Sequence, residues 1–193
     1  MSENMQKLDV TLESIGGFSR FQCFAQASIS AGMSSIGLIV YSFGFNTQEP
    51  DYLCTYSTDS DAAWTECGRE DICGDASTVE SWKIDWASDR SLKNWYEKLD
   101  LYCEPKWKTA AIMSIFFAGW TLTLPFLPRL ADVRGRRPIW RIAVALQFLL
   151  MLVVLWTRRF EVMLMAMFVL GCLSSIRVCV GYNYLIEFMP LRL

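Results

Sequence analysis

The sequence predicts an all-α membrane protein with four transmembrane helices and a large cysteine-containing outer loop. Of its 193 residues, 53% are hydrophobic and only 20% are charged, a balance that is more apolar than that of typical soluble domains. The apolar residues are concentrated in four blocks, and at a rise of ~1.5 Å per residue each block can cross roughly 30 Å of hydrocarbon. A polar connection of 63 residues separates the first two blocks and carries four cysteines.

The blocks and their connections give the expected organisation of the chain. In order, we expect an N-terminal inner segment at 1–20, a first transmembrane helix at 21–45, an outer loop at 46–108, a second helix at 109–127, an inner loop at 128–138, a third helix at 139–157, a fourth at 162–186, and an inner C-terminal end at 187–193. A soluble bundle of buried helices is the alternative. Such helices carry a polar stripe, whereas 21–45 has no charged residue.

The first block could also be a secretory signal peptide. A signal peptide begins with basic residues and has a short apolar core. Here the preceding segment carries Glu3, Asp9 and Glu13 against one Lys7, and the apolar run is too long. We therefore interpret 21–45 as a retained helix.

Charge in the connections predicts the orientation. Asp132 alone opposes five arginines in or beside the inner loop, namely Arg129, Arg134, Arg136, Arg137 and Arg141. Connections rich in arginine and lysine stay on the cytoplasmic side, so both chain ends are expected inside. Arg158 and Arg159 in the third connection weaken this rule without reversing it. The outer loop holds 14 acidic and 7 basic residues and is expected outside.

The outer loop contains an even set of cysteines, Cys54, Cys67, Cys73 and Cys103. In an oxidising compartment such a set indicates two disulfides, for which three connectivities exist. Free thiols and a four-cysteine metal site are the alternatives. The metal site is disfavoured because the spacing includes no Cys-x-x-Cys pair, so we assign no metal ligands. The other cysteines, Cys23, Cys172 and Cys179, lie in apolar blocks and are interpreted as packing residues.

A short amphipathic helix is expected inside the outer loop. Between Ser91 and Leu101, apolar residues recur at helical spacing, and Asp89 is available as an N-cap. The acidic excess of the loop would either concentrate cations at an entrance or only keep the surface solvated.

The composition argues against an enzyme. The chain has no histidine, which removes Ser-His-Asp triads, Cys-His pairs and imidazole proton transfer. We find no nucleophile–base pair and no cofactor motif, so neither catalysis nor a cofactor is expected. No feature indicates binding to nucleic acid.

The inner loop is the most informative motif. Gly135 would give a tight turn its backbone freedom, and Asp132 can accept hydrogen bonds from arginines or helix ends. Flanking arginines can hold neighbouring helix ends through carboxylates. A simple positive-inside anchor is the alternative interpretation.

The loop resembles the cytoplasmic signature of the major facilitator superfamily, in its organic cation and anion transporter (solute carrier) branch. The matching positions are Leu130, Asp132, Gly135, Arg136 and Arg137, while Pro128 and Val133 depart from the pattern. Three further stretches are similar to this branch in order and spacing: residues 15–22, residues 94–107, and the set Gly171, Gly181, Tyr182 and 187–190.

This resemblance implies that the chain corresponds to the first third of a facilitator fold. It implies an inner charge network formed by Asp132, Gly135, Arg136, Arg137 and Glu187. Met167 stands where the family often has an arginine, and Arg192 is out of register with the basic residue that follows the family's glutamate.

The resemblance also sets the functional expectation. The family binds substrate between two six-helix halves, and alternating access needs two bodies that move around a central site. We therefore expect a partial or truncated organic-ion transporter-like protein that does not transport alone. Its partners would be the lipid bilayer, partner membrane chains or a missing transporter half, and a small organic ion. The resemblance implies the plasma membrane.

The alternative function is a non-transporting structural accessory subunit of a larger membrane complex. A respiratory-chain assembly in the mitochondrial inner membrane is an example.

Arg177 is the one ionisable residue deep inside a predicted span. Such a residue is a functional hypothesis by default. It would face an anionic substrate, a carboxylate on a partner helix, or a lipid head group. Since the four spans contain no acidic residue, its partner is expected from outside them.

Overall fold

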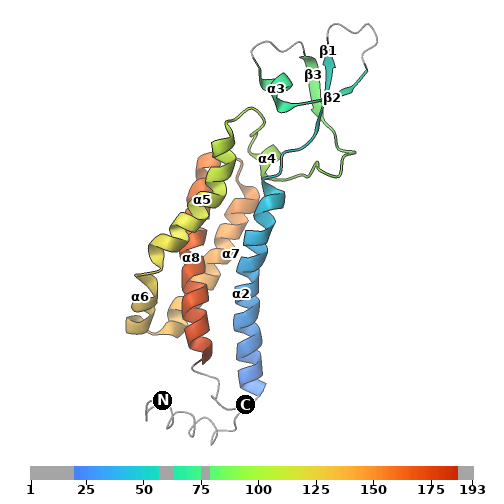
Figure 1. Ribbon diagram of the computed structural model, residues 1–193. Coiled ribbons are helices and arrows are strands. Elements are labelled where there is room, and N and C mark those ends of the chain that lie inside the picture. The colour runs from blue at the N-terminus through green and yellow to red at the C-terminus, as the bar shows by residue number, and fades with distance from the viewer. Residues whose placement is uncertain (1–19, 57–62, 75–78, 187–193) are drawn as a thin grey trace, which may run out of the picture.

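A computed structural model describes residues 20–56, 63–74 and 79–186. Long helices form a bundle (Figure 1). The bundle contains α2 (Arg20–Asn46), α5 (Lys106–Thr123), α6 (Leu127–Arg134), α7 (Arg136–Trp156) and α8 (Phe160–Ile186). The described residues between α2 and α5, at 47–56, 63–74 and 79–105, form a smaller unit at one end of it, which we call the outer module. By length and apolar content α2, α7 and α8 can each cross a membrane, and α5 with α6 makes a fourth span if the bent pair is counted as one. The chain is thus compatible with a multi-pass membrane protein.

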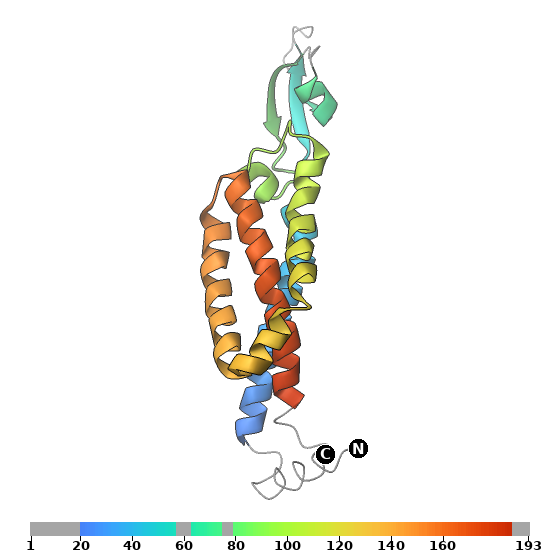
Figure 2. The ribbon, with the colours of Figure 1, turned by 90° about the vertical axis from the view of Figure 1, so that its left-hand side faces the viewer.

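Helix α8 is the centre of the bundle. It packs against α5, α7 and α2. In its most apolar stretch of 18 residues, 56% are buried, compared with 11% in the corresponding stretch of α2 and 17% in that of α7. Figure 2 shows α8 running between α7 and α5. Large side chains such as Leu146, Phe148 and Leu149 on α7 stay exposed, as expected for surfaces that meet lipid rather than water.

Helices α5 and α8 approach each other closely through two glycines. A Cβ atom added to Gly119 would lie 2.3 Å from the carbonyl oxygen of Phe168, and one added to Gly171 would lie 2.0 Å from that of Phe116. Only glycine fits at these two points. This is the small-residue packing typical of membrane helices, which lack a hydrophobic drive to associate.

The inner connection differs from the predicted loop at 128–138. It contains the short helix α6, which is bent by 48° relative to α5. Helix α5 ends at Thr123 because Pro125 has no N–H to continue the hydrogen-bond ladder. Pro128 is tolerated in the first turn of α6, and Gly135, with φ of 90°, separates α6 from α7.

The outer module contains β-structure, so the all-α prediction holds for the spans and is wrong for the outer loop. Strands β1 (Tyr52–Tyr56), β2 (Thr65–Cys67) and β3 (Val79–Ile84) form an antiparallel sheet in the order β2-β1-β3. The small helix α3 (Arg69–Cys73) follows β2. Strands this short, three to six residues long, give little periodic signal in a sequence.

The predicted short helix of the outer loop exists, but it is smaller and has another cap. Helix α4 (Trp95–Lys98) is a single turn, and its N-cap is Asn94 rather than Asp89. The Asn94 side chain accepts hydrogen bonds from the backbone N–H groups of Tyr96 and Glu97. Asparagine is among the best residues for this role.

Two disulfides hold the outer module, as the even cysteine set predicts. Cys54 pairs with Cys67, and Cys73 pairs with Cys103. The first bridge joins β1 to β2, and the second joins the end of α3 to the segment that leads into α5. Cys23, Cys172 and Cys179 are free.

Candidate functional site

The buried arginine of α8 joins three helices. Arg177 is only 4% exposed, and its guanidinium donates hydrogen bonds to the side-chain oxygen of Gln147 on α7, to the backbone carbonyl of Gly32 on α2, and to Ser35 Oγ at 2.8 Å. Its Nε–H group is buried and has no hydrogen-bond partner among the described residues. These hydrogen bonds come from within the spans, and the anionic partner that the sequence predicts from outside them stays a prediction.

The charge of Arg177 is not neutralised by these contacts. All three acceptors are uncharged, and no acidic side chain lies within ion-pair distance of Arg177 anywhere in residues 20–56, 63–74 and 79–186. An unneutralised cation inside a membrane bundle carries a large electrostatic penalty unless an anion approaches it. Chemically, the site can hold three helices together and attract a carboxylate or another anion.

Two glycines make room around this site. A Cβ on Gly32 would lie 3.2 Å from Arg177 Nη2 and 3.4 Å from Trp140, and a Cβ on Gly181 would lie 3.1 Å from Trp140 Nε1. Trp140 on α7 therefore fits against α2 and α8 beside the arginine. These small positions let α2 come close enough for its backbone to accept a hydrogen bond.

Only part of the predicted inner charge network lies within the described residues. Arg136 donates to Asp132 Oδ1, with distances of 3.0 Å from Nε and 2.9 Å from Nη2. This pair links the end of α6 to the start of α7 across Gly135. Arg137 is exposed. Glu187 lies outside the described residues, as do residues 1–19 of the inner segment expected at 1–20 and all of the inner end expected at 187–193. Met167 is fully buried in the apolar core.

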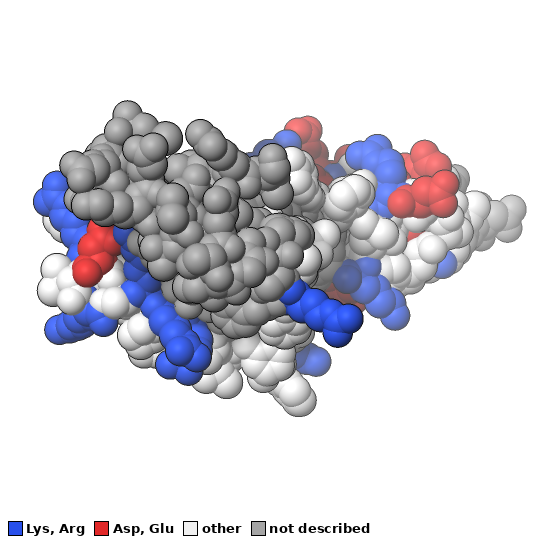
Figure 3. Space-filling view, turned by 90° about the horizontal axis from the view of Figure 1, so that it is seen from below, with Lys and Arg blue, Asp and Glu red and all other residues white. Residues whose placement is uncertain are grey.

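Basic side chains surround the inner end of the bundle. Arg20, Arg129, Arg134, Arg137 and Arg141 are all exposed there, and Figure 3 views the molecule from this end, with lysine and arginine in blue. The start of α2, the α6–α7 junction and the end of α8 share this end, opposite the outer module (Figure 1). A membrane would therefore separate the basic end from the disulfide-bonded end.

At the other end, α4 holds two spans together. The Asn94 amide donates to the backbone carbonyls of Phe45 (2.9 Å) and Gln48 (2.8 Å) at the end of α2. The Lys98 ammonium donates to the carbonyls of Val154 and Leu155 at the end of α7. Sequence reasoning missed both roles. A polar side chain that binds the end of a helix far away in the sequence leaves no local sequence pattern.

Comparisons of the chain with protein-family models, with curated proteins and with solved structures found no match. The function of the chain is therefore inferred from its sites.

Proposed function

We propose that the chain is an organic-ion transporter-like membrane unit of the facilitator type, which needs further membrane helices for transport and resides in the plasma membrane. The observation that carries this proposal is the unneutralised Arg177. Three helices converge on its guanidinium, and burial of a charge at this depth is typical of a substrate or ion pathway.

The hydrogen bonds of Arg177 support a role beyond packing. They fix the position of the guanidinium but leave its charge available, and Nε has no acceptor in the part of the chain that the structure describes. A carboxylate could pair with such a group far more strongly than in water, because the surrounding dielectric is low. The fitting partner is an organic anion or an acidic side chain on an added helix.

The outward side of α2 supports the need for further helices. Ala27, Ala31 and Ser34 recur on one side of this helix and are exposed. Small residues on a membrane helix let another helix approach closely. The same observation favours the second candidate, a structural accessory subunit of a larger complex, for example in the mitochondrial inner membrane.

Uptake by proteoliposomes tests the proposal. Vesicles that contain only this chain should accumulate tetraethylammonium and p-aminohippurate at the rate of empty vesicles, since two bodies are needed for alternating access. Saturable uptake by the chain alone would contradict the need for further helices.

Cross-linking in native membranes separates the two candidates. A photoreactive group at Ser34 on α2 should capture another membrane chain, while one at Phe148 on the exposed side of α7 should capture mainly lipid. Capture of helices from a solute carrier supports the transporter-like unit. Capture of respiratory-chain subunits, with mitochondrial fractionation, supports the accessory subunit instead.

A further inference from the structure

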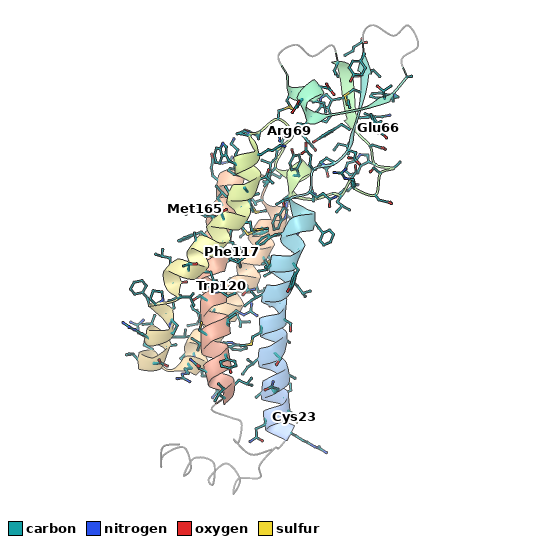
Figure 4. All side chains as sticks on the ribbon, viewed as in Figure 1. Cys23, Glu66, Arg69, Phe117, Trp120 and Met165 are labelled. Atoms are coloured by element: carbon teal, nitrogen blue, oxygen red, sulfur yellow. A yellow bond between two sulfur atoms is a disulfide. The ribbon has the colours of Figure 1, made fainter. Side chains whose placement is uncertain are left out.

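A groove lies where the outer module meets the outer ends of α2 and α5. Two hollows of about 460 Å³ and 790 Å³ both include Glu49, Arg69 and Lys106 among their lining residues, and a smaller one of about 150 Å³ shares Glu49 and Arg69. In Figure 4, Arg69 is labelled on the side of the outer module that faces the top of α5. We call this region, lined by Glu49, Arg69, Tyr96, Lys106 and Met113, the outer groove.

The acidic side of the outer groove is formed by one carboxylate. Glu49 is half-buried, yet it makes no ion pair within the described ranges. Beside it are Tyr52 and Tyr96, each 3% exposed, whose buried hydroxyl groups lie close to each other, and that of Tyr96 also lies close to the Glu49 carboxylate. Burial, and then the nearby Glu49 carboxylate, raise the pKa of Tyr96.

The basic side of the outer groove consists of Arg69 and Lys106. Arg69 donates to the backbone carbonyl of Glu104, next to the Cys73–Cys103 bridge. The Glu104 carboxylate is already occupied by Lys108 at 2.7 Å. The Lys106 ammonium makes no hydrogen bond or ion pair within the part of the chain that the structure describes. Two cations therefore face the hollow without acidic partners.

The wall between these two sides is apolar. Ala110 and Met113 on α5 line the 460 Å³ hollow together with the aromatic ring of Tyr96. Ligand sites typically combine such walls with a few polar groups of fixed position. A carboxylate and an aromatic ring suit an alkylammonium group, while a guanidinium and an ammonium suit a carboxylate.

We propose that the outer groove binds a small zwitterionic organic ion, with its ammonium group at Glu49 and Tyr96 and its carboxylate at Arg69 and Lys106. This inference rests on the proposed function for the class of ligand, and it concerns capture at the outer face rather than movement across the membrane.

Calorimetric titration of the chain in lipid nanodiscs tests the proposal. The probe is 4-(trimethylammonio)butyrate, and each of its controls, butyrate and butyltrimethylammonium, lacks one of the two charges. The zwitterion should bind saturably and roughly tenfold or more tightly than either control, since each partly exposed ion pair contributes about 1 kcal/mol. Equal binding of butyltrimethylammonium would overturn the assignment of Arg69 and Lys106.

Substitutions locate the site. Glu49→Gln should weaken binding of the zwitterion roughly tenfold, and Glu49→Asp should restore part of the affinity. Glu66→Gln is the matched control, because Glu66 is exposed on β2 (Figure 4). Lys106→Met, at an exposed position, should weaken the zwitterion and leave butyltrimethylammonium unchanged, which keeps the test decisive if Glu49→Gln fails to fold.

The outcomes separate this inference from the proposed function. If the wild-type chain shows no saturable binding of the zwitterion, or if Glu49→Gln and Glu66→Gln bind it equally, the groove is not the site. Arg177 then still supports the proposed function. If the groove binds the zwitterion while cross-linking places the chain among respiratory-chain subunits, the groove inference holds and the transporter-like function fails.

Discussion

Gln147 is the residue that most directly supports the buried charge of Arg177. It is 5% exposed and accepts a hydrogen bond from Arg177 across the α7–α8 interface. The acceptors at Gly32 and Ser35 come from α2. Loss of the Gln147 oxygen would leave a charged donor with one fewer partner inside the bundle.

We predict that Gln147→Leu destabilises the bundle by about 1–3 kcal/mol, because it removes the acceptor and leaves a buried donor unsatisfied. Gln26→Leu is the control, since among the described residues the Gln26 amide donates to Ser30 of its own helix and to no other helix, and it should cost less than half as much. Unfolding in nanodiscs measures both variants. Equal effects would show that Arg177 does not depend on Gln147.

The tyrosines of the outer module provide a prediction about pH. Burial raises the pKa of Tyr52 and Tyr96, and burial with the Glu97 and Asp100 carboxylates raises the pKa of Tyr102 to about 12. In the unfolded chain these hydroxyls ionise near pH 10. Between about pH 10 and 12 the unfolded state releases protons that the folded state retains, so stability falls as pH rises through this window.

Phenolate absorbance and circular dichroism measured together test this prediction. The three tyrosines should remain protonated until the outer module unfolds above about pH 10. Their ionisation near pH 10 with the module intact would contradict it.

At the residue scale, the sequence predicts which side chains are unusual but not how they meet. The even cysteine set predicts two disulfides, whereas the pairing of Cys54 with Cys67 depends on the β1–β2 register. Arg177 is recognisable from its position in an apolar block. Its acceptors are not, because Gly32, Ser35 and Gln147 come together only when three helices pack.

At the scale of elements, helix packing depends on the two glycines between α5 and α8. We predict that Gly171→Ala destabilises the bundle by about 1–3 kcal/mol, because the added methyl group meets the Phe116 carbonyl. Gly44→Ala on α2 is the matched control, since nothing lies within 4 Å of its added Cβ, and it should be neutral or stabilising by up to ~1 kcal/mol. Thermal unfolding measures the difference, and equal effects of the two changes would contradict this packing.

The elements themselves were predictable to different degrees. The bounds predicted from three long apolar blocks agree with those of α2, α7 and α8 to within three residues. This is because a membrane helix needs a run of about twenty apolar residues. The second span was less predictable, since Pro125 ends α5 early and α6 continues at an angle. The outer sheet was missed because β-pairing between short strands depends on contacts distant in sequence.

At the scale of the whole molecule, the fold separates two chemically distinct ends. One end of the bundle carries the disulfides, the outer groove, and the contacts by which Asn94 and Lys98 join α2 and α7. The exposed arginines around Gly135 lie at the other (Figures 1 and 3). Charge asymmetry predicts that the arginine-rich end faces the cytoplasmic side. Both proposals depend on this arrangement, because Arg177 must lie within the membrane and the outer groove must face the outside.

Accessibility of single cysteines to a membrane-impermeant maleimide tests this arrangement most directly. In a chain whose free cysteines Cys23, Cys172 and Cys179 are changed to serine, Lys93→Cys on the outer module and Arg134→Cys on α6 each introduce one exposed thiol. We expect Lys93→Cys to be labelled in intact cells and Arg134→Cys only after the membrane is permeabilised. Labelling of both positions from the same side would contradict the membrane-spanning account.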